Sequence, residues 1–232
     1  MITDKYRDFS ELSRHEIEGK DYKIECRDRG SQILILAIHG GKIERGTAEI
    51  AYRIAGQEYS FYTFLGIKTR GNKDLHIASL KFDEPRCRAA VAAAEIAVSI
   101  HGHNDDQNEF VMIGGLHGEI VPVLQTELEN AGYAINPVRE LRPLTGMLDG
   151  GIKPPFASFG NNHRLKSVVI SNGIKSPESG WGGTSLENIC NRCGGKKGVQ
   201  FEISRKLRER FETQPAFAKV FADKVCTVLS RF

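Results

Sequence analysis

The chain has 232 residues, 40% of them hydrophobic and 26% charged, which is typical of a globular protein long enough to bury a core. The formal net charge of +3 is too small and too dispersed to indicate nucleic-acid binding, and it suits an anionic substrate slightly better than a cationic one. No apolar run reaches the roughly 18 residues of a membrane span, and the N-terminus has no apolar signal core, so we expect no membrane partner and a cytoplasmic location.

The first predicted elements are a polar entry, two strands and a helix. Residues 1–20 are polar and indicate a short helical or irregular segment. Residues 22–27 alternate apolar and polar side chains, which indicates an edge strand. Residues 32–38 are apolar at nearly every position, which predicts a central parallel strand covered on both faces. Residues 47–55 predict an amphipathic helix with Thr47 as its N-terminal cap.

Five further elements follow in the middle of the chain. Residues 59–67 are rich in aromatic and other β-forming side chains and predict another strand. A helix begins at Pro85 and continues through residue 94. Residues 96–100 and 109–113 predict two more strands, and residues 120–128 predict an amphipathic helix that a glycine closes.

The last part of the chain begins with a segment of different character. Residues 139–183 are rich in Gly, Pro, Ser and Asn around one predicted strand at 165–171, and a loop-rich insertion of this length usually has a function such as covering a site. Residues 199–203 predict the last strand and 217–229 the last helix. The alternation of strands and helices predicts a single α/β domain over residues 1–232, a three-layer sandwich around a mostly parallel, mixed sheet.

The five cysteines are an odd number and widely scattered, which favours free thiols in a reducing compartment over a disulfide framework. Cys190 and Cys193 form a single CxxC pair. A structural zinc knuckle needs a second pair, and a redox site needs a thioredoxin-like helix after the motif. Neither pattern is visible, so we predict no metal or redox role for this pair.

Histidines follow two of the predicted buried strands. His39 and His101 each come directly after an apolar run, and Glu44 follows His39 across a Gly-Gly turn. Because ligands of open α/β sheets bind beyond the carboxyl ends of the strands, these side chains can converge on one point. Two histidines and a carboxylate with one open position describe a catalytic zinc site. His103 is the alternative to His101, because it points the same way if the strand continues.

Glu202 lies inside the predicted strand at 199–203. A carboxylate in an apolar strand is costly unless it is paired or faces a cleft. Partial burial would raise its pKa toward neutrality. A general base that takes a proton from water at a zinc ion and passes it to a leaving amine needs such a pKa, so we predict Glu202 as the catalytic base.

Three other residues are candidate substrate contacts. Arg70 follows the predicted strand at 59–67 in a Gly-containing loop, and a guanidinium suits a substrate carboxylate. His76 lies in a short β-like stretch and is a core histidine, a substrate contact or an electrophile. His103 becomes a substrate or supporting contact if His101 is the ligand. Three other arginines are alternatives to Arg70 on similar grounds: Arg45, Arg53 and Arg86. Each of these four arginines is equally well a solvated surface residue.

Several motifs, taken together and in order, resemble those of the phage-type poly-γ-glutamate hydrolases. The similarity spans about residues 33–210. It rests on His39-x-x-x-x-Glu44 with the Arg-Gly-Thr-x-Glu that follows, on LHIAS at 75–79, FDEP at 82–85, VSIHG at 98–102, NICN at 188–191 and GVQFEIS at 198–204.

This resemblance implies a fold of the zinc carboxypeptidase (phosphorylase/hydrolase-like) type with one zinc ion per chain. It implies that His39, Glu44 and His101 hold the zinc and that Glu202 is the general base. The expected reaction is hydrolysis of γ-glutamyl amide bonds, most directly in poly-γ-glutamate, and the expected partner is an anionic γ-glutamyl polymer or peptide. Two features depart from the family pattern: the length of the insertion at 139–183 and the CxxC pair.

Two other functions stay open on the sequence. A zinc carboxypeptidase, a deacylase or a cell-wall amidase could use the same scaffold, because specificity lies in loops. A phage accessory protein could bind an anionic partner without catalysis, although the intact set of His39, Glu44, His101 and Glu202 speaks against it. We expect a monomer without nucleic-acid or membrane partners, released on host lysis if a phage encodes it.

Overall fold

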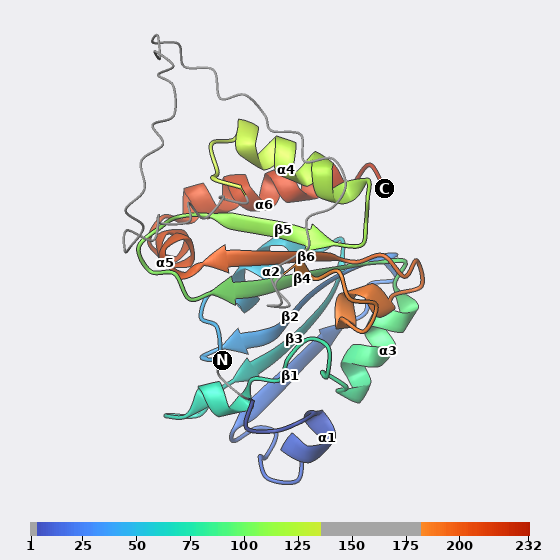
Figure 1. Ribbon diagram of the computed structural model, residues 1–232, viewed down its shortest axis with the longest axis vertical. Helices are drawn as coiled ribbons and strands as arrows, with labels where there is room; N and C mark the ends of the chain where they lie inside the picture. Colours follow the sequence, from blue (N-terminus) through green and yellow to red (C-terminus); the bar gives the residue numbers. More distant parts are fainter. Residues whose placement is uncertain (1–3, 136–181) are drawn as a thin grey trace, which may run out of the picture.

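The computed structural model describes residues 4–135 and 182–232, and Figure 1 shows their arrangement. A six-stranded sheet forms the centre, in the order β1-β3-β2-β4-β6-β5. The predicted strand at 165–171 and the insertion at 139–183, apart from its last two residues, lie outside the described residues. The strands are β1 (Tyr22–Arg27), β2 (Ile33–Gly41), β3 (Ser60–Gly66), β4 (Ile96–His103), β5 (Val111–Gly115) and β6 (Val199–Ser204).

The inner strands of the sheet are parallel, and both edges are antiparallel. β3, β2, β4 and β6 pair in parallel, whereas β1 pairs antiparallel with β3 and β5 pairs antiparallel with β6. Burial at nearly every position of β2 and β4 is what a parallel interior covered on both faces requires. The predicted α/β fold with a mostly parallel, mixed sheet is confirmed, and β1 is the edge strand that its alternation indicates.

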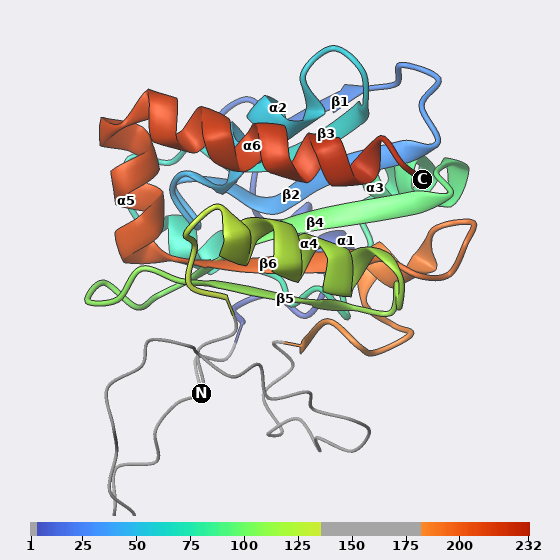
Figure 2. The same cartoon turned by 90° about the horizontal axis from the view of Figure 1, so that it is seen from above.

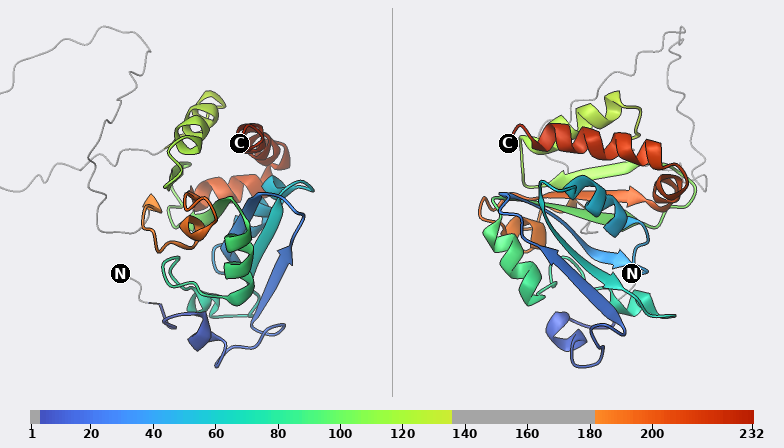
Figure 3. Two further views of the ribbon diagram at one scale, coloured as in Figure 1. Left: turned by 90° about the vertical axis from the view of Figure 1, so that its right-hand side faces the viewer. Right: turned by 180° about the vertical axis from the view of Figure 1, so that it is seen from behind.

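Helices cover both faces of this sheet. One face carries α2 (Thr47–Ala55), α4 (Ile120–Asn130) and α6 (Pro215–Leu229), and α6 contacts both of the others, as Figure 2 and the right-hand view of Figure 3 show. The other face carries α1 (Phe9–Leu12), α3 (Pro85–Ala93) and the short helix η3 (Ile189–Arg192). Ile35 of β2 points into the first layer and Leu36 into the second, so two apolar cores enclose the sheet. Within the described ranges, no helix has the length and apolarity to cross a membrane.

Two details of the helices differ from expectation. The cap of α2 is Gly46, with a φ of +88°, and not Thr47, whose hydroxyl donates to backbone carbonyls of the preceding turn. A helix that the sequence analysis did not predict, α5 (Arg205–Thr213), follows β6 directly. Its sequence is mostly charged, and the pair Leu207 and Phe211, four residues apart, supplies its buried apolar contacts.

β2 and β4 are longer than predicted, so His39 and His101 lie inside the sheet and not after it. Between Ala37 and Gly40 the pairing of β2 with β3 shifts by one residue, which is a β-bulge. A regular strand would place His39 on the same face as Ala37 and opposite to the face of Ile38. The bulge instead turns His39 toward the face that carries His101, and the centroids of the two imidazole rings lie 4.9 Å apart. This irregularity of β2 positions the site described below.

The burial of one face of α6 in the first core gives a prediction for stability. Val225 is fully buried in the first core, whereas Val220 on the same helix is 45% exposed. We expect Val225→Ala to lower the free energy of unfolding by about 2 kcal/mol, because it leaves a cavity. Val220→Ala is the matched control and should change it by less than about 0.5 kcal/mol. Urea denaturation measures both, and equal effects of the two substitutions would contradict the assigned packing of α6.

Candidate metal centre

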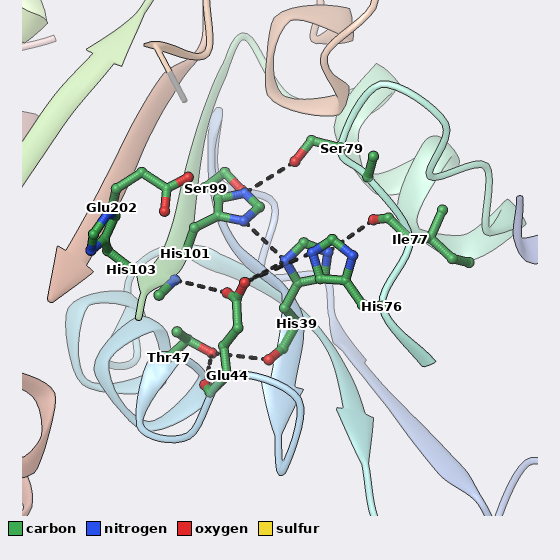
Figure 4. Close-up of polar contacts among 12 residues, drawn as sticks. His39, Glu44, Thr47, His76, Ile77, Ser79, Ser99, His101, His103 and Glu202 are labelled. Atoms are coloured by element: carbon green, nitrogen blue, oxygen red, sulfur yellow. Dashed lines mark hydrogen bonds and ion pairs between the residues drawn. The ribbon is translucent and has the colours of Figure 1, made fainter. Parts of the chain in front are cut away.

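Three side chains from different parts of the chain meet at the carboxyl ends of the parallel strands (Figure 4). His39 comes from β2, His101 from β4, and Glu44 from the turn after β2. Nδ1 of His39 lies 3.1 Å from Nδ1 of His101 and 3.2 Å from Oε1 of Glu44. One ligand atom from each residue lies within 4.8 Å of the other two. The structure therefore brings together the three residues that the sequence singles out.

Each of the three side chains is oriented by a hydrogen bond at its second polar atom, the one that does not face the cluster. Nε2 of His39 donates to the carbonyl oxygen of Ile77 at 2.9 Å, which leaves Nδ1 as the atom facing the cluster. Nε2 of His101 hydrogen-bonds Oγ of Ser99 at 2.8 Å with the same effect. Oε2 of Glu44 accepts from a backbone N–H, that of residue 102, at 2.7 Å, so Oε1 faces the histidines.

A tight turn returns Glu44 to the end of its own strand. The backbone N–H of Glu44 donates to the carbonyl of His39 at 2.9 Å, and the hydroxyl of Thr47 donates to the carbonyl of Glu44 at 2.8 Å. Gly40 is needed because a Cβ atom there would lie 2.6 Å from Oγ1 of Thr63, closer than real Cβ atoms come to any neighbour. The glycine turn is therefore a packing requirement of the site.

Two of the three spacings between the ligand atoms are close to those around a tetrahedral dication. Zinc binds nitrogen and oxygen ligands at about 2.0–2.1 Å, so two ligand atoms at a tetrahedral angle lie about 3.3 Å apart. The distances from His39 to its two neighbours, 3.1 and 3.2 Å, are close to this value. Two imidazoles and one carboxylate suit zinc better than calcium or magnesium, which prefer oxygen ligands. These residues form a candidate metal-binding site with three protein ligands.

The charges of the cluster are strongly interdependent. Burial opposes the ionisation of Glu44, but His39 outweighs it and lowers the pKa of Glu44 to about 2. Burial also opposes protonation of His39, and the carboxylate of Glu44 overcomes it, so the pKa of His39 is raised above its ordinary value. Burial, reinforced by the charge of His39, lowers the pKa of His101 to about 3. Two of the three ligand atoms are therefore free of protons well below neutral pH.

Glu202 stands one strand away from the cluster. It pairs with His101 across β4 and β6, so the two side chains share a face of the sheet (Figure 4). Burial first, and the charge of Glu44 second, raise the pKa of Glu202 well above its ordinary value. Its Oε1 accepts a hydrogen bond from Nε2 of Gln200 at 3.1 Å. A carboxyl group in this place can hold or release a proton beside the candidate metal.

Arg208 is a buried cation next to the two carboxyl groups, and the sequence analysis did not identify it. It lies on α5 and donates to the carbonyl oxygens of Ile203 at 3.0 Å and of His103 at 3.1 Å, and also to that of Arg45. Its charge favours the ionised forms of both Glu44 and Glu202. The guanidinium joins the ends of β4 and β6 to the turn that carries Glu44.

His76 lies at the edge of the cluster. Its ring stacks on that of His39 with centroids 4.0 Å apart, and its Nε2 lies 3.9 Å from Oε1 of Glu44. Nδ1 of His76 lies 2.6 Å from Oδ1 of Asp4, whose other oxygen accepts from the backbone N–H of Ala78 at 2.8 Å. His76 is therefore held in a fixed orientation with its second nitrogen toward the site.

The other candidate substrate contacts lie differently. His103 is buried, packs edge-on against Phe110 and accepts from the N–H of Asp105, and it is not in the three-residue cluster. Arg70 is exposed, and none of the contacts described here joins it to the cluster. Among its rivals, Arg45 and Arg53 are exposed, and Arg86 forms ion pairs with Glu18 and Glu84.

Some residues around the cluster could have been found from the sequence, and others could not. Ser99 precedes His101 by two residues and Gln200 precedes Glu202 by two, so strand periodicity places each pair on one face. Asp4 and Arg208 lie far from the cluster in sequence, and no local pattern connects them with it.

Comparison with known proteins assigns the chain to a family. The model of the family described as poly-gamma-glutamate hydrolase matches residues 6–152 and 161–225. Two relatives come from Bacillus subtilis (strain 168). The UPF0714 protein YmaC is 30% identical over 90% of this chain and 72% of its own length. The UPF0714 protein YndL is 39% identical over 56% of this chain, and the match spans only 50% of YndL itself.

Solved structures agree with this assignment. The structure of a bacteriophage poly-gamma-glutamate hydrolase superposes with a TM-score of 0.76 and 26% identity, covering 99% of this chain and 98% of the phage chain. A structure described as zinc-free apo YndL gives a TM-score of 0.76 and 27% identity over 98% of both chains. The fold, the order of the motifs and the family match agree, and the chain belongs to the poly-gamma-glutamate hydrolase family.

Proposed function

We propose that the protein is a zinc-dependent hydrolase that cleaves γ-glutamyl amide bonds, with poly-γ-glutamate as its substrate class. The observation that carries the proposal is the meeting of His39, Glu44 and His101, with Glu202 one strand away. Family membership supports the substrate class. The distances of 3.1 and 3.2 Å from Nδ1 of His39 to its two neighbouring ligand atoms, and a structural relative described as zinc-free, support zinc as the metal.

In this proposal, Nδ1 of His39, Nδ1 of His101 and Oε1 of Glu44 hold the ion. Bound zinc supplies Lewis-acid chemistry, which polarises the amide carbonyl and lowers the pKa of a water molecule. Glu202 takes one proton from this water while the water oxygen bonds to the carbonyl carbon. As the C–N bond breaks, Glu202 passes the proton to the leaving amine. The products are a carboxyl group and an amine, and Glu202 regains its starting state.

The surrounding cations suit an anionic polymer that carries one free α-carboxylate on each unit. Arg208 supplies positive charge beside Glu44 and Glu202, while its N–H groups bind backbone carbonyls. Nδ1 of His76 donates to Asp4, so Nε2 of the neutral ring is an acceptor, and we assign to it a contact with a substrate N–H group at the edge of the site. We assign carboxylate binding further from the site to Arg70, and a supporting contact near the base to His103.

Zinc content tests the assigned ligands. We expect one zinc per chain in the purified protein and less than about a tenth of that in His39→Ala, because a three-ligand site loses one of its nitrogens. His15→Ala is the matched control, since His15 is exposed, and it should keep full occupancy. Elemental analysis after dialysis against a weak chelator measures the difference. Equal zinc content in the two variants would remove the basis of the proposal.

The pH dependence of zinc binding follows from the pKa shifts of the ligands. Protons and zinc compete for the same atoms, and only His39 has a raised pKa, while those of His101 and Glu44 are about 3 and about 2. Between about pH 4 and the pKa of His39, zinc should displace one proton, so affinity falls about tenfold for each unit that the pH falls. Above that pKa the affinity should level off.

Competition with a chelator of known affinity measures this slope. The Glu202→Gln variant is the cleaner background, because its side chain no longer releases a proton when a dication binds nearby. If zinc affinity fell about a hundredfold for each pH unit, two protons would be displaced on binding. His101 would then be protonated as well, which would contradict the assigned charge state of the cluster.

Catalysis tests the role of Glu202. We expect Glu202→Gln to lower kcat about 10²- to 10⁴-fold with zinc content unchanged, because the amide cannot accept the proton. Glu109→Gln is the matched control, since Glu109 pairs with Arg210 at the surface, and it should keep its activity.

Poly-α-glutamate carries the same charge with a different linkage. Cleavage of that polymer alone would reject the γ-glutamyl assignment and leave the zinc hydrolase standing.

A further inference from the structure

A line of side-chain amides leads from a backbone N–H group to Glu202. The backbone N–H of Cys190 donates to Oδ1 of Asn188 at 3.2 Å, and Nδ2 of Asn188 donates to Oε1 of Gln200 at 2.8 Å. Nε2 of Gln200 then donates to Oε1 of Glu202 at 3.1 Å. Asn188 and Gln200 are each only 2% exposed, so water cannot readily replace these contacts.

The direction of every hydrogen bond in this line is determined by its first member. A backbone N–H can only donate, so the atom of Asn188 that faces it must be the oxygen. The amide nitrogen of Asn188 therefore faces Gln200, whose oxygen must accept from it. The nitrogen of Gln200 is then the atom presented to Glu202. The orientation of each amide is assigned from this donor and acceptor chemistry.

The line is also held in place by its surroundings. Gly183, with a φ of +62°, lies so close over Gln200 that a Cβ atom there would come within 2.8 Å of Cβ of Gln200 and within 3.2 Å of its Oε1. Nδ2 of Asn191 donates to the carbonyl of Gly183 at 2.6 Å, and Oδ1 of Asn191 accepts from the N–H of Gly198 at 2.9 Å. The amide of Gln200 therefore has little room to rotate.

We infer that Gln200 is a positioning residue for Glu202 and that Asn188 sets the polarity of their contact. The N–H of Gln200 occupies Oε1 of Glu202, which leaves Oε2 as the oxygen that exchanges a proton with the reacting water and the leaving amine. This inference rests on the proposed role of Glu202 as general base. It assigns no contact with substrate to Gln200 or Asn188.

Removal of the donor tests the first part. Gln200→Met keeps the length of the side chain and loses its hydrogen bonds, and we expect kcat on poly-γ-glutamate to fall about 10- to 100-fold with KM and zinc content unchanged. Gln125→Met is the matched control, because Gln125 donates to the carbonyl of Ile113 on β5, and it should keep wild-type kcat. Wild-type kcat in a normally folded, zinc-loaded Gln200→Met protein would overturn the inference.

A variant that inverts the amide of Gln200 tests whether Asn188 sets the orientation of that amide. Asn188→Asp still accepts from the N–H of Cys190 but has no N–H for Gln200, so the amide of Gln200 should invert and place its oxygen against Glu202. We expect kcat to fall at least as far as in Gln200→Met. A purely structural role at the start of η3 would leave Asn188→Asp with wild-type kcat, since this variant keeps the capping bond.

A double-mutant cycle separates a linked pair from two independent defects. Asn188→Asp should have no further effect in the Gln200→Met background, because no amide is left to invert. If the losses of kcat in the two single variants multiplied in the double variant, the inferred link between Asn188 and Gln200 would be wrong. Side-chain 15N NMR of Gln200, identified by its absence in Gln200→Met, adds a readout apart from activity, and its N–H signals should move in Asn188→Asp.

Failure of the proposed function gives a different result. If Glu202→Gln kept full activity, the general-base assignment would be wrong whatever Gln200 does. If Glu202→Gln were inactive and Gln200→Met were like wild type, only the positioning role would be lost. In the Glu202→Gln background the Gln200→Met substitution should change nothing further, and an added loss there would also contradict the inference.

Discussion

The site depends on the β-bulge in β2. An uninterrupted strand would send His39 to the opposite face of the sheet from His101, whereas in the structure Nδ1 of His39 lies 3.1 Å from Nδ1 of His101. The extra residue between Ala37 and Gly40 turns His39 onto the face of His101. The turn that follows then carries Glu44 back to the same point. Every later feature of the site builds on this local break in strand pairing.

The second requirement is that the buried polar groups of the site are paired. His39 and His101 are almost fully buried, and each has a hydrogen-bond partner on the side away from the cluster, Ile77 and Ser99. Arg208 places one positive charge near two carboxyl groups. Unpaired groups in these positions would each cost several kcal/mol, so the surrounding contacts are a condition for the site to exist in a folded protein. The same contacts hold the ligand atoms in place.

Much of the fold could be predicted, because its elements have strong local patterns. The apolar run of β2, the alternation in β1 and the heptad-like face of α6 each reflect which side chains must be buried. The sequence pattern does not predict α5, because this mostly charged segment has few apolar residues to show a period. The predicted ends of β2 and β4 come before the observed ends, because Gly and His interrupt the apolar run although the backbone pairing continues.

The residue types of the site and their order along the chain can be read from the amino-acid sequence alone. Histidines at the ends of two inner strands, a carboxylate across a glycine turn and a carboxylate within a strand were all visible, because parallel strands bring such ends to one edge. The contact of Asp4 with His76 and the place of Arg208 beside the two carboxyl groups become visible only in the folded chain. These contacts depend on strand register, on a bulge and on the packing of segments distant in sequence, and short-range patterns carry no information about them.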